Sequence, residues 1–369
     1  MNNFRCAAPW RGLHINLDGD IRVCCAGQPG SFGNVKTDKL DCLTQSQYLR
    51  EIRCDIKSGK LHPTYCQACI DNIGRGEREW FTEIHPDIDY ESILDDGQHQ
   101  FQSIDVRWNN TCNLSCTYCS SYFSSTWAKI ERIQSNQPPS RQFDHILDQI
   151  VDHDSVVKTM MLVGGEPLLI PHNERLLSVA NNDTTIVLIT NLSVPLLSNR
   201  VFGALEPLAR VNWNVSLENI GTRFEFVRCG ADWSLLTENL DILDRLFPRH
   251  TISISAIYHV FNCTRLQEFL HYMHGRNLNV NWNTVGQEYL DPRFHDQSLR
   301  QLALQEIDAV FSDQSLTLSL TETDFFTKIA EQLAQERCVP HTRSQFGDHV
   351  RQDRSRFIQL WPELESTLA

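Results

Sequence analysis

Six short apolar stretches alternate with stretches of helical patterning through the middle of the chain. Most are rich in Val, Ile or Thr, as strands are. They are Ser103–Trp108, Lys158–Val163, Thr185–Thr190, Val211–Leu217, Thr251–Tyr258 and Leu278–Val285, and the helical patterns between them include Phe143–Val151 and Trp233–Leu246. Strand–helix alternation predicts an α/β fold with a parallel sheet and right-handed crossovers. Six units fit a partial (β/α)6 TIM-like barrel, and a doubly wound open sheet would show the same alternation.

The pattern divides the 369 residues into four regions. Residues 1–80 hold seven of the thirteen cysteines, and residues 81–100 are acidic and typical of a linker. The strand–helix pattern occupies residues 101–290, and residues 291–369 are mostly helical by pattern. We therefore expect a small Cys-rich N-terminal domain, a linker, a barrel and a C-terminal helical extension.

Composition narrows the class of protein. A net charge of −13 argues against a broad nucleic-acid-binding face. No apolar run approaches the roughly 20 residues of a membrane span, and the first residues do not resemble a signal peptide. Thirteen cysteines then indicate a reducing compartment and metal or cluster ligation rather than disulfides. We expect a cytoplasmic protein with neither a nucleic-acid nor a membrane partner.

A Cys-x3-Cys-x2-Cys motif follows the first predicted strand. Its cysteines are Cys112, Cys116 and Cys119. Three thiolates on so short a loop can bind three irons of a [4Fe–4S] cluster and leave the fourth iron open to a small molecule. A closed zinc site needs a fourth ligand, which this motif lacks. A zinc knuckle or a chance spacing is the alternative.

The second predicted strand runs directly into Gly164-Gly165-Glu166-Pro167. Two glycines at a strand end let the backbone turn and pass close to a ligand. Pro167 biases Glu166 toward an extended backbone. A plain strand-to-helix turn is the alternative.

Four N-terminal cysteines form two pairs. Asp18-Gly19 predicts a hairpin, which brings Cys6 and Cys24 together, and Cys66 and Cys69 form a Cys-x2-Cys pair. These four thiols predict one metal or cluster site, with Cys25 as a competitor for Cys24. A zinc ribbon would use the same ligands. The six cysteines outside these motifs are expected to be small buried residues: Cys25, Cys42, Cys54, Cys229, Cys263 and Cys338.

The cysteine triad and the Gly-Gly-Glu-Pro motif, in this order, resemble those of the radical S-adenosylmethionine (SAM) superfamily. The resemblance implies that the open iron of the triad cluster binds SAM. One electron would then cleave the sulfonium to give a 5′-deoxyadenosyl radical. It also implies that residues 164–167 receive the methionine amino group of SAM.

The same resemblance implies further SAM contacts. Asn191 would lie near the ribose or carboxylate, Ser216 near the ribose, and Tyr118 beside the adenine. Arg228 would bind the carboxylate, for which a planar guanidinium suits better than an ammonium. Glu218 stands where many relatives have aspartate, and its side chain is one methylene longer. Helix capping is the alternative role for such strand-end residues.

The N-terminal cysteines resemble those of SPASM and twitch extensions, including Pro9-Trp10 after Cys6 and Gly33-Asn34 before the helix. Four matched ligands imply one auxiliary [4Fe–4S] cluster. The extension usually follows the barrel, whereas here it precedes it.

Relatives with such extensions mostly modify ribosomally made peptides by crosslinking, epimerisation, oxidation or excision of a tyrosine-derived fragment. The resemblance thus implies a precursor peptide, a small winged-helix protein that binds its leader, and an electron donor such as flavodoxin or ferredoxin. We expect an elongated cleft between residues 1–80 and the strand ends near Gly164, Asn191 and Ser216. A radical SAM dehydrogenase or rearrangement enzyme for a small molecule is the alternative, and a cluster-carrying electron-transfer or assembly protein is a weaker one.

Overall fold

The computed structural model describes residues 6–27, 30–74, 99–134, 137–138, 141–153, 156–247, 250–335, 339, 342–350 and 353–368. The chain forms two compact units, which are described separately below. Unit 1 comprises Met1–Cys112, Ser121–Ile189 and Leu196–Asn212, and unit 2 comprises Asn113–Ser120, Thr190–Pro195 and Trp213–Ala369.

The sheet of unit 1 joins barrel strands to the N-terminal hairpin. Its strands follow the order β7-β6-β4-β1-β2-β3. Their bounds are β1 Gly12–Ile15, β2 Asp20–Arg22, β3 Gly33–Asn34, β4 Ser103–Val106, β6 Thr159–Leu162 and β7 Thr185–Thr190. β4, β6 and β7 are parallel, and β1 is parallel to β4 with Gly12 opposite Ser103. The N-terminal region therefore extends the same sheet.

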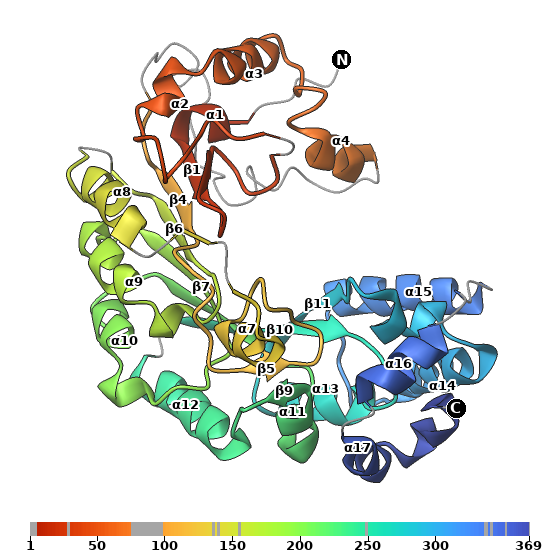
Figure 1. Cartoon of the computed structure of the whole chain (residues 1–369). Helices are drawn as coiled ribbons and strands as arrows, with labels where there is room; N and C mark the ends of the chain where they lie inside the picture. The colour runs from red at the N-terminus through yellow and green to blue at the C-terminus, as the bar shows by residue number, and fades with distance from the viewer. Residues whose placement is uncertain are drawn as a thin grey trace. The chain divides into compact units, whose positions relative to one another are not determined.

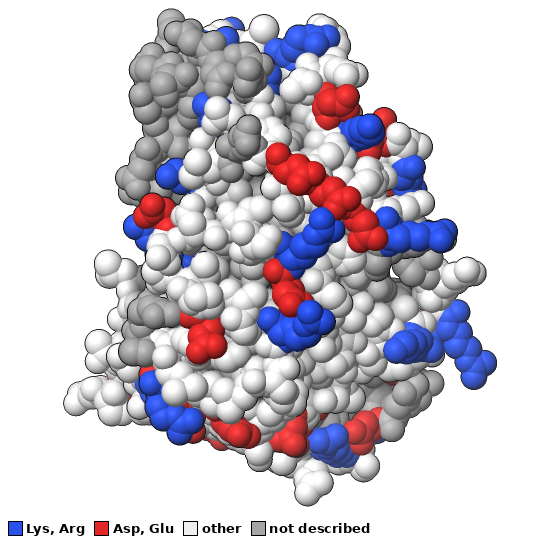
Figure 2. Space-filling model, turned by 90° about the vertical axis from the view of Figure 1, so that its left-hand side faces the viewer, with Lys and Arg blue, Asp and Glu red and all other residues white. Residues whose placement is uncertain are grey.

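Helices α8 (Arg141–Val151), α9 (Pro171–Leu176) and α10 (Arg200–Leu205) line one face of β4, β6 and β7 (Figure 1). In α8, Phe143, Ile146, Leu147 and Ile150 are buried, which is the spacing of one apolar helix face. On the outer face, acidic and basic side chains interleave (Figure 2), and exposed pairs such as Arg175–Asp148 link neighbouring helices.

The remaining helical segments of unit 1 are short. They are α1 Ala8–Arg11, α2 Cys42–Gln45, α3 Gln47–Lys57, α4 Gln67–Gly74, α7 Ser125–Glu131, η1 Pro167–Leu169, η2 Leu177–Val179 and η3 Leu196–Ser198.

Most of β8 and all of β10 and β11 lie in unit 2, in the order β8-β10-β11, and β10 and β11 are parallel. Their bounds are β8 Val211–Ser216, β10 Thr251–Tyr258 and β11 Asn279–Thr284, with helices α11 Gly221–Val227, α12 Trp233–Leu246 and α13 Leu266–Gly275. A separate antiparallel pair joins β5 (Ser115–Cys116) to β9 (Arg228–Cys229). This small pair places the triad loop beside the residues that follow α11.

The C-terminal helices gather beside β11 and α13 (Figure 1). They are α14 Gln297–Ser312, α15 Leu320–Ala334, α16 Thr342–Val350 and α17 Arg354–Leu360, with η4 Glu288–Leu290, η5 Pro292–Phe294 and η7 Pro362–Leu368. Aromatic rings fill their core: Phe346, Phe357 and Trp361 pack with Phe261. A capping box between Ser319 and Glu322 starts α15.

All six predicted barrel strands are confirmed, as β4, β6, β7, β8, β10 and β11, and so are the two named helices. Within each unit successive barrel strands are added on the same side, whereas a doubly wound sheet reverses direction at a switch point. The fold is therefore α/β with a parallel, TIM-like sheet and a Cys-rich N-terminal region.

The predictions for the linker and for Cys338 concern residues that lie largely outside the described ranges. The predicted linker, residues 81–100, lies outside the described residues except for residues 99 and 100, and Cys338 lies outside them as well. Within the described ranges, the structure contains no helix long and apolar enough to cross a membrane.

Candidate functional site

The first cysteine of the triad is fixed by the start of α7. The Cys112 N–H donates to Ser125 Oγ over 3.1 Å, and the Cys112 carbonyl accepts from Thr126 Oγ1 over 2.7 Å. Ser124 caps this helix by accepting from the Trp127 N–H. The roles of these hydroxyls were not predicted from the sequence. A serine pair ahead of a helical pattern is an N-cap signal that could have found them.

The other two cysteines belong to the β5–β9 pair and the turn after it. Cys116 lies opposite Arg228 in this ladder, the Thr117 N–H donates to the Val227 carbonyl over 2.8 Å, and the Cys119 N–H donates to the Cys116 carbonyl over 3.0 Å. The Cys116 side chain is buried. Burial raises the pKa of the Cys119 thiol, while the Ser120 backbone and Arg228 oppose that rise.

The Gly-Gly-Glu-Pro motif packs against the backbone that leads into the triad. The Glu166 N–H donates to the Thr111 carbonyl over 2.7 Å. A Cβ on Gly165 would lie 2.2 Å from that same carbonyl oxygen, and Gly164 has a φ of +135°. Glu166 has the extended backbone that Pro167 was predicted to impose. Both glycines are therefore required by close backbone approach and chain conformation.

Three of the predicted residues form a cluster in unit 2, in which Arg228 and Glu218 are buried and Tyr118 is half-buried. Arg228 Nη2 donates to Glu218 Oε2 over 2.6 Å, and the Tyr118 hydroxyl donates to Glu218 Oε1 over 3.2 Å. The Arg228 guanidinium lies 5.5 Å from the centre of the Tyr118 ring. Burial tends to lower the pKa of Arg228, but the Glu218 carboxylate outweighs it and the pKa is raised. The guanidinium is therefore held by a carboxylate of the chain itself.

The third strand end is tied to the triad loop through amides. Asn191 Nδ2 donates to Asn113 Oδ1 over 3.0 Å, and Asn113 Nδ2 donates to the Ser193 carbonyl over 2.8 Å. The Gln287 side chain also donates to the Tyr118 carbonyl over 2.8 Å. Ser216 is the last residue of β8 and is half-buried. Asn113 and Gln287 were not singled out from the sequence, because isolated amides carry no spacing signal.

The four predicted N-terminal ligands line one pocket of unit 1. The hairpin turns at Gly19, whose φ is +85°, as the Asp-Gly pair predicts. Cys6, Cys24, Cys66 and Cys69 line this pocket together with apolar side chains such as Ile56 and Leu61. Among the described side chains, no group of three or more His, Cys, Asp or Glu converges in the arrangement of a single metal ion.

The electrostatics of this pocket suit a cationic cluster. Burial raises the pKa of the Cys6 thiol well above its ordinary value, and the nearby Cys24, Cys66 and Cys69 raise it further. Burial and the neighbouring Cys25 likewise raise the pKa of Cys24. Thiolates in such surroundings need a positive partner, which the irons of a cluster supply. The four-cysteine donor set therefore fits an iron–sulfur cluster, as it would fit a structural zinc ion.

The structure distinguishes Cys24 from its neighbour. Cys24 lines the pocket, whereas the Cys25 thiol lies near Asp105 and Arg107. Burial and then the Asp105 carboxylate raise the pKa of Cys25 to about 11. This arrangement favours Cys24 as the ligand.

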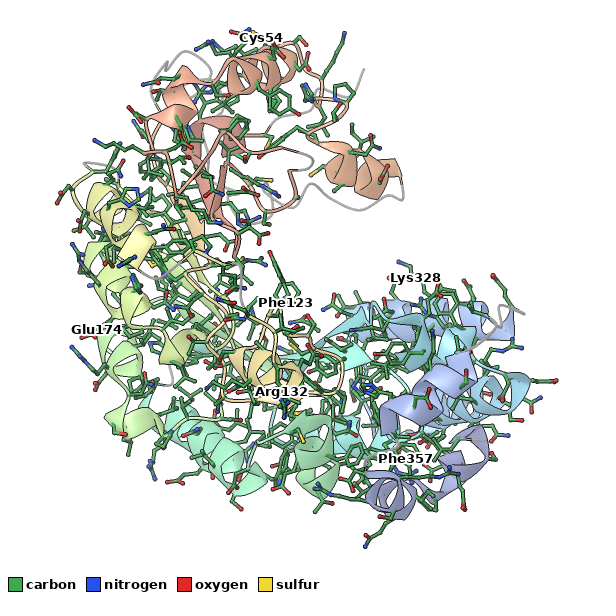
Figure 3. All side chains as sticks on the ribbon, viewed as in Figure 1. Cys54, Phe123, Arg132, Glu174, Lys328 and Phe357 are labelled. Carbon is green, nitrogen blue, oxygen red and sulfur yellow. The ribbon has the colours of Figure 1, made fainter. Side chains whose placement is uncertain are left out.

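The prediction that the other cysteines are buried is only partly confirmed. Cys263 is buried and Cys25 and Cys42 are half-buried, but Cys54 and Cys229 are exposed, so the prediction is wrong for these two. In α3 the buried residues are Leu49, Ile52 and Ile56, which places Cys54 on the opposite side of the helix (Figure 3).

Two family comparisons match the two cysteine regions. Residues 106–273 match the sequence model of the radical SAM superfamily, and residues 6–70 match SPASM, an iron–sulfur cluster-binding domain. The chain carries a radical SAM domain preceded by a SPASM domain. The SPASM match implies auxiliary iron–sulfur clusters rather than zinc. The radical SAM domain implies a [4Fe–4S] cluster and SAM. No curated protein gives a significant sequence match.

Solved structures give partial matches at low sequence identity. The anSMEcpe structure with bound AdoMet is 16% identical, with a TM-score of 0.40, and the alignment covers 55% of this chain and 58% of that one. The same protein has been solved with AdoMet and a peptide, Kp18Cys. SuiB of Streptococcus suis bound to S-adenosylmethionine is 16% identical, with a TM-score of 0.32 and 63% of each chain covered. The alignments thus cover less than two thirds of the length of these two proteins.

Proposed function

We propose that this radical SAM–SPASM protein is an enzyme that binds SAM at a cluster held by Cys112, Cys116 and Cys119 and modifies a ribosomally made peptide. One observation carries the first part: both flanks of the triad are fixed by the predicted SAM-binding segments. Glu166 of the Gly-Gly-Glu-Pro motif bonds to Thr111, and Arg228 lies opposite Cys116. A zinc knuckle or a chance cysteine spacing gives no reason for either contact.

When bound, the cluster and SAM supply an electron transfer that cleaves SAM and a carbon radical that abstracts hydrogen from the substrate. The residues of the chain prepare the place where this happens. Gly164 and Gly165 keep the strand end close to residues 109–111, since any side chain at residue 165 would collide with carbonyl oxygens. Asn191 orients Asn113, the residue after Cys112.

The auxiliary cluster is proposed to bind to Cys6, Cys24, Cys66 and Cys69. The pocket these thiols line is otherwise apolar, and an apolar surround limits the access of water to a cluster. When bound there, the cluster would hold the substrate or accept an electron.

The peptide substrate is supported by the SPASM match, because extensions of this type accompany peptide substrates in the family that the chain resembles. A precursor peptide would then be accompanied by a leader-binding protein and an external electron donor such as flavodoxin or ferredoxin. A radical SAM enzyme acting on a small molecule is the second candidate, favoured if the substrate site is a closed pocket rather than a groove.

The test uses a precursor peptide encoded beside the gene. The peptide is deuterated uniformly, incubated anaerobically with the reconstituted enzyme, SAM and a reductant, and 5′-deoxyadenosine is analysed by mass spectrometry. Deuterium in 5′-deoxyadenosine and a mass change in the peptide are expected. Turnover of SAM without deuterium transfer from any adjacent peptide would favour the small-molecule candidate.

A further inference from the structure

Beyond the binding of SAM, we infer that Arg228 and Glu218 set the reduction potential of the cluster on the triad loop, with Arg228 raising it and Glu218 lowering it. The inference rests on the proposed function for the presence of that cluster. Arg228 is a positioning and tuning residue here, acting on the cluster through the sulfur of Cys116.

The contact with sulfur is held by the backbone. Cys116 and Arg228 are paired residues in the β5–β9 ladder, so their separation is set by main-chain hydrogen bonds. Arg228 Nη1 lies 3.9 Å from Cys116 Sγ and donates toward it. Neighbouring strands hold such partners at a nearly constant distance. The backbone pairing therefore keeps Arg228 beside Cys116.

The second Nη atom of the same guanidinium donates to Glu218. Arg228 Nη2 contacts Glu218 Oε2 at 2.6 Å, and the Glu218 side chain is fully buried. Tyr118, between the last two cysteines, donates to the other Glu218 oxygen. A carboxylate satisfied in this way is not displaced easily, because the guanidinium would lose a buried, charge-assisted partner.

The direction of each effect follows from charge. Reduction of the cluster adds one electron and no proton, with an external one-electron donor as its source, so negative charge increases at the sulfurs. A cation and an N–H donor at Cys116 stabilise the reduced form, and an anion close by destabilises it. Arg228, Glu218 and Cys116 are all buried, and a low local dielectric strengthens both effects.

The experiment is a redox titration of the full-length, anaerobically reconstituted chain without SAM, with dithionite as reductant and electron paramagnetic resonance as readout. A variant with Cys112, Cys116 and Cys119 all changed to alanine identifies the signal of the triad cluster by its loss. Arg228→Gln is expected to lower the ratio of reduced to oxidised cluster about tenfold at fixed potential, which is 59 mV for one electron. Glu218→Gln is expected to raise that ratio.

Controls separate this effect from damage to the fold. Arg276→Gln removes a guanidinium of the same unit that pairs with Asp241, and it is expected to leave the potential unchanged. Should Arg228→Gln fail to fold, the test uses Arg228→Lys, which keeps the charge, and Glu218→Gln. The changes that these two variants cause in the reduction potential should have opposite signs or differ clearly in size.

Two results would overturn the inference. If both variants keep the wild-type potential without SAM while Arg228→Gln binds SAM more weakly, Arg228 acts on SAM alone. If the wild-type chain shows no signal that the triple cysteine variant loses, the cluster itself is absent, and the proposed function falls together with this inference.

Discussion

At the scale of single residues, the N-terminal pocket makes a clear distinction between two adjacent cysteines. Cys24 lines the pocket and Cys25 lies near Asp105 and Arg107. The Cys24→Ala variant should therefore lose the auxiliary cluster, and with it about half of the iron bound to the chain. The Cys25→Ala variant should keep this cluster. The measurement is iron per chain after anaerobic reconstitution. Equal iron in the two variants would refute the assignment of Cys24.

The buried pair of Arg228 and Glu218 also has a consequence for stability. Removing one partner of a buried ion pair leaves an uncompensated charge, which typically costs about 3–5 kcal/mol. We expect Arg228→Met to lower the free energy of unfolding by that amount in denaturant titrations of the cluster-free protein. Arg276→Met removes a more exposed pair with Asp241 and should cost less than about 1 kcal/mol. Similar losses in both variants would contradict the account.

At the scale of elements, the strand end at residues 164–167 depends on the absence of a side chain. A Cβ at Gly165 would meet backbone oxygens of Thr111 and Asn110 at 2.2 and 2.5 Å. Gly165→Ala should thus cost about 3 kcal/mol, the upper range of overpacking, and should weaken SAM binding. Gly203, within α10, has open space around its Cβ position, so Gly203→Ala should stabilise the protein by about 0.5–1 kcal/mol. Chemical unfolding and SAM titration measure both, and an unaffected Gly165→Ala would contradict the packing described.

The elements also show what the sequence could predict. Strands such as β7 and β10 were located to the residue because their apolar pattern is local. The parallel pairing of β1 with β4 was not anticipated, since it joins segments about 90 residues apart and depends on a register that no local pattern encodes. Likewise the triad was found from its spacing, whereas the contact between Arg228 and Glu218 depends on side-chain packing after two strands have paired.

At the scale of the whole molecule, the order of domains is the unusual feature. The SPASM match at residues 6–70 precedes the radical SAM match at residues 106–273, as the cysteine pattern predicted. The predicted domain boundaries, and the elongated cleft between residues 1–80 and the strand ends, stay predictions. A peptide-binding groove there would be supported by crosslinks from a bound precursor peptide to both residues 1–80 and the strand ends, and crosslinks confined to one of the two regions would count against it.

The central claim, a SAM-cleaving cluster together with one auxiliary cluster, is tested most directly by iron content and SAM cleavage in two proteins. The reconstituted wild-type chain should hold about eight irons and release 5′-deoxyadenosine from SAM on reduction. The variant with Cys112, Cys116 and Cys119 changed to alanine should keep about four irons and release none. About four irons with one zinc in the wild type would contradict the auxiliary cluster, and SAM cleavage by the triple variant would contradict the claim that the triad cluster is the site of that chemistry.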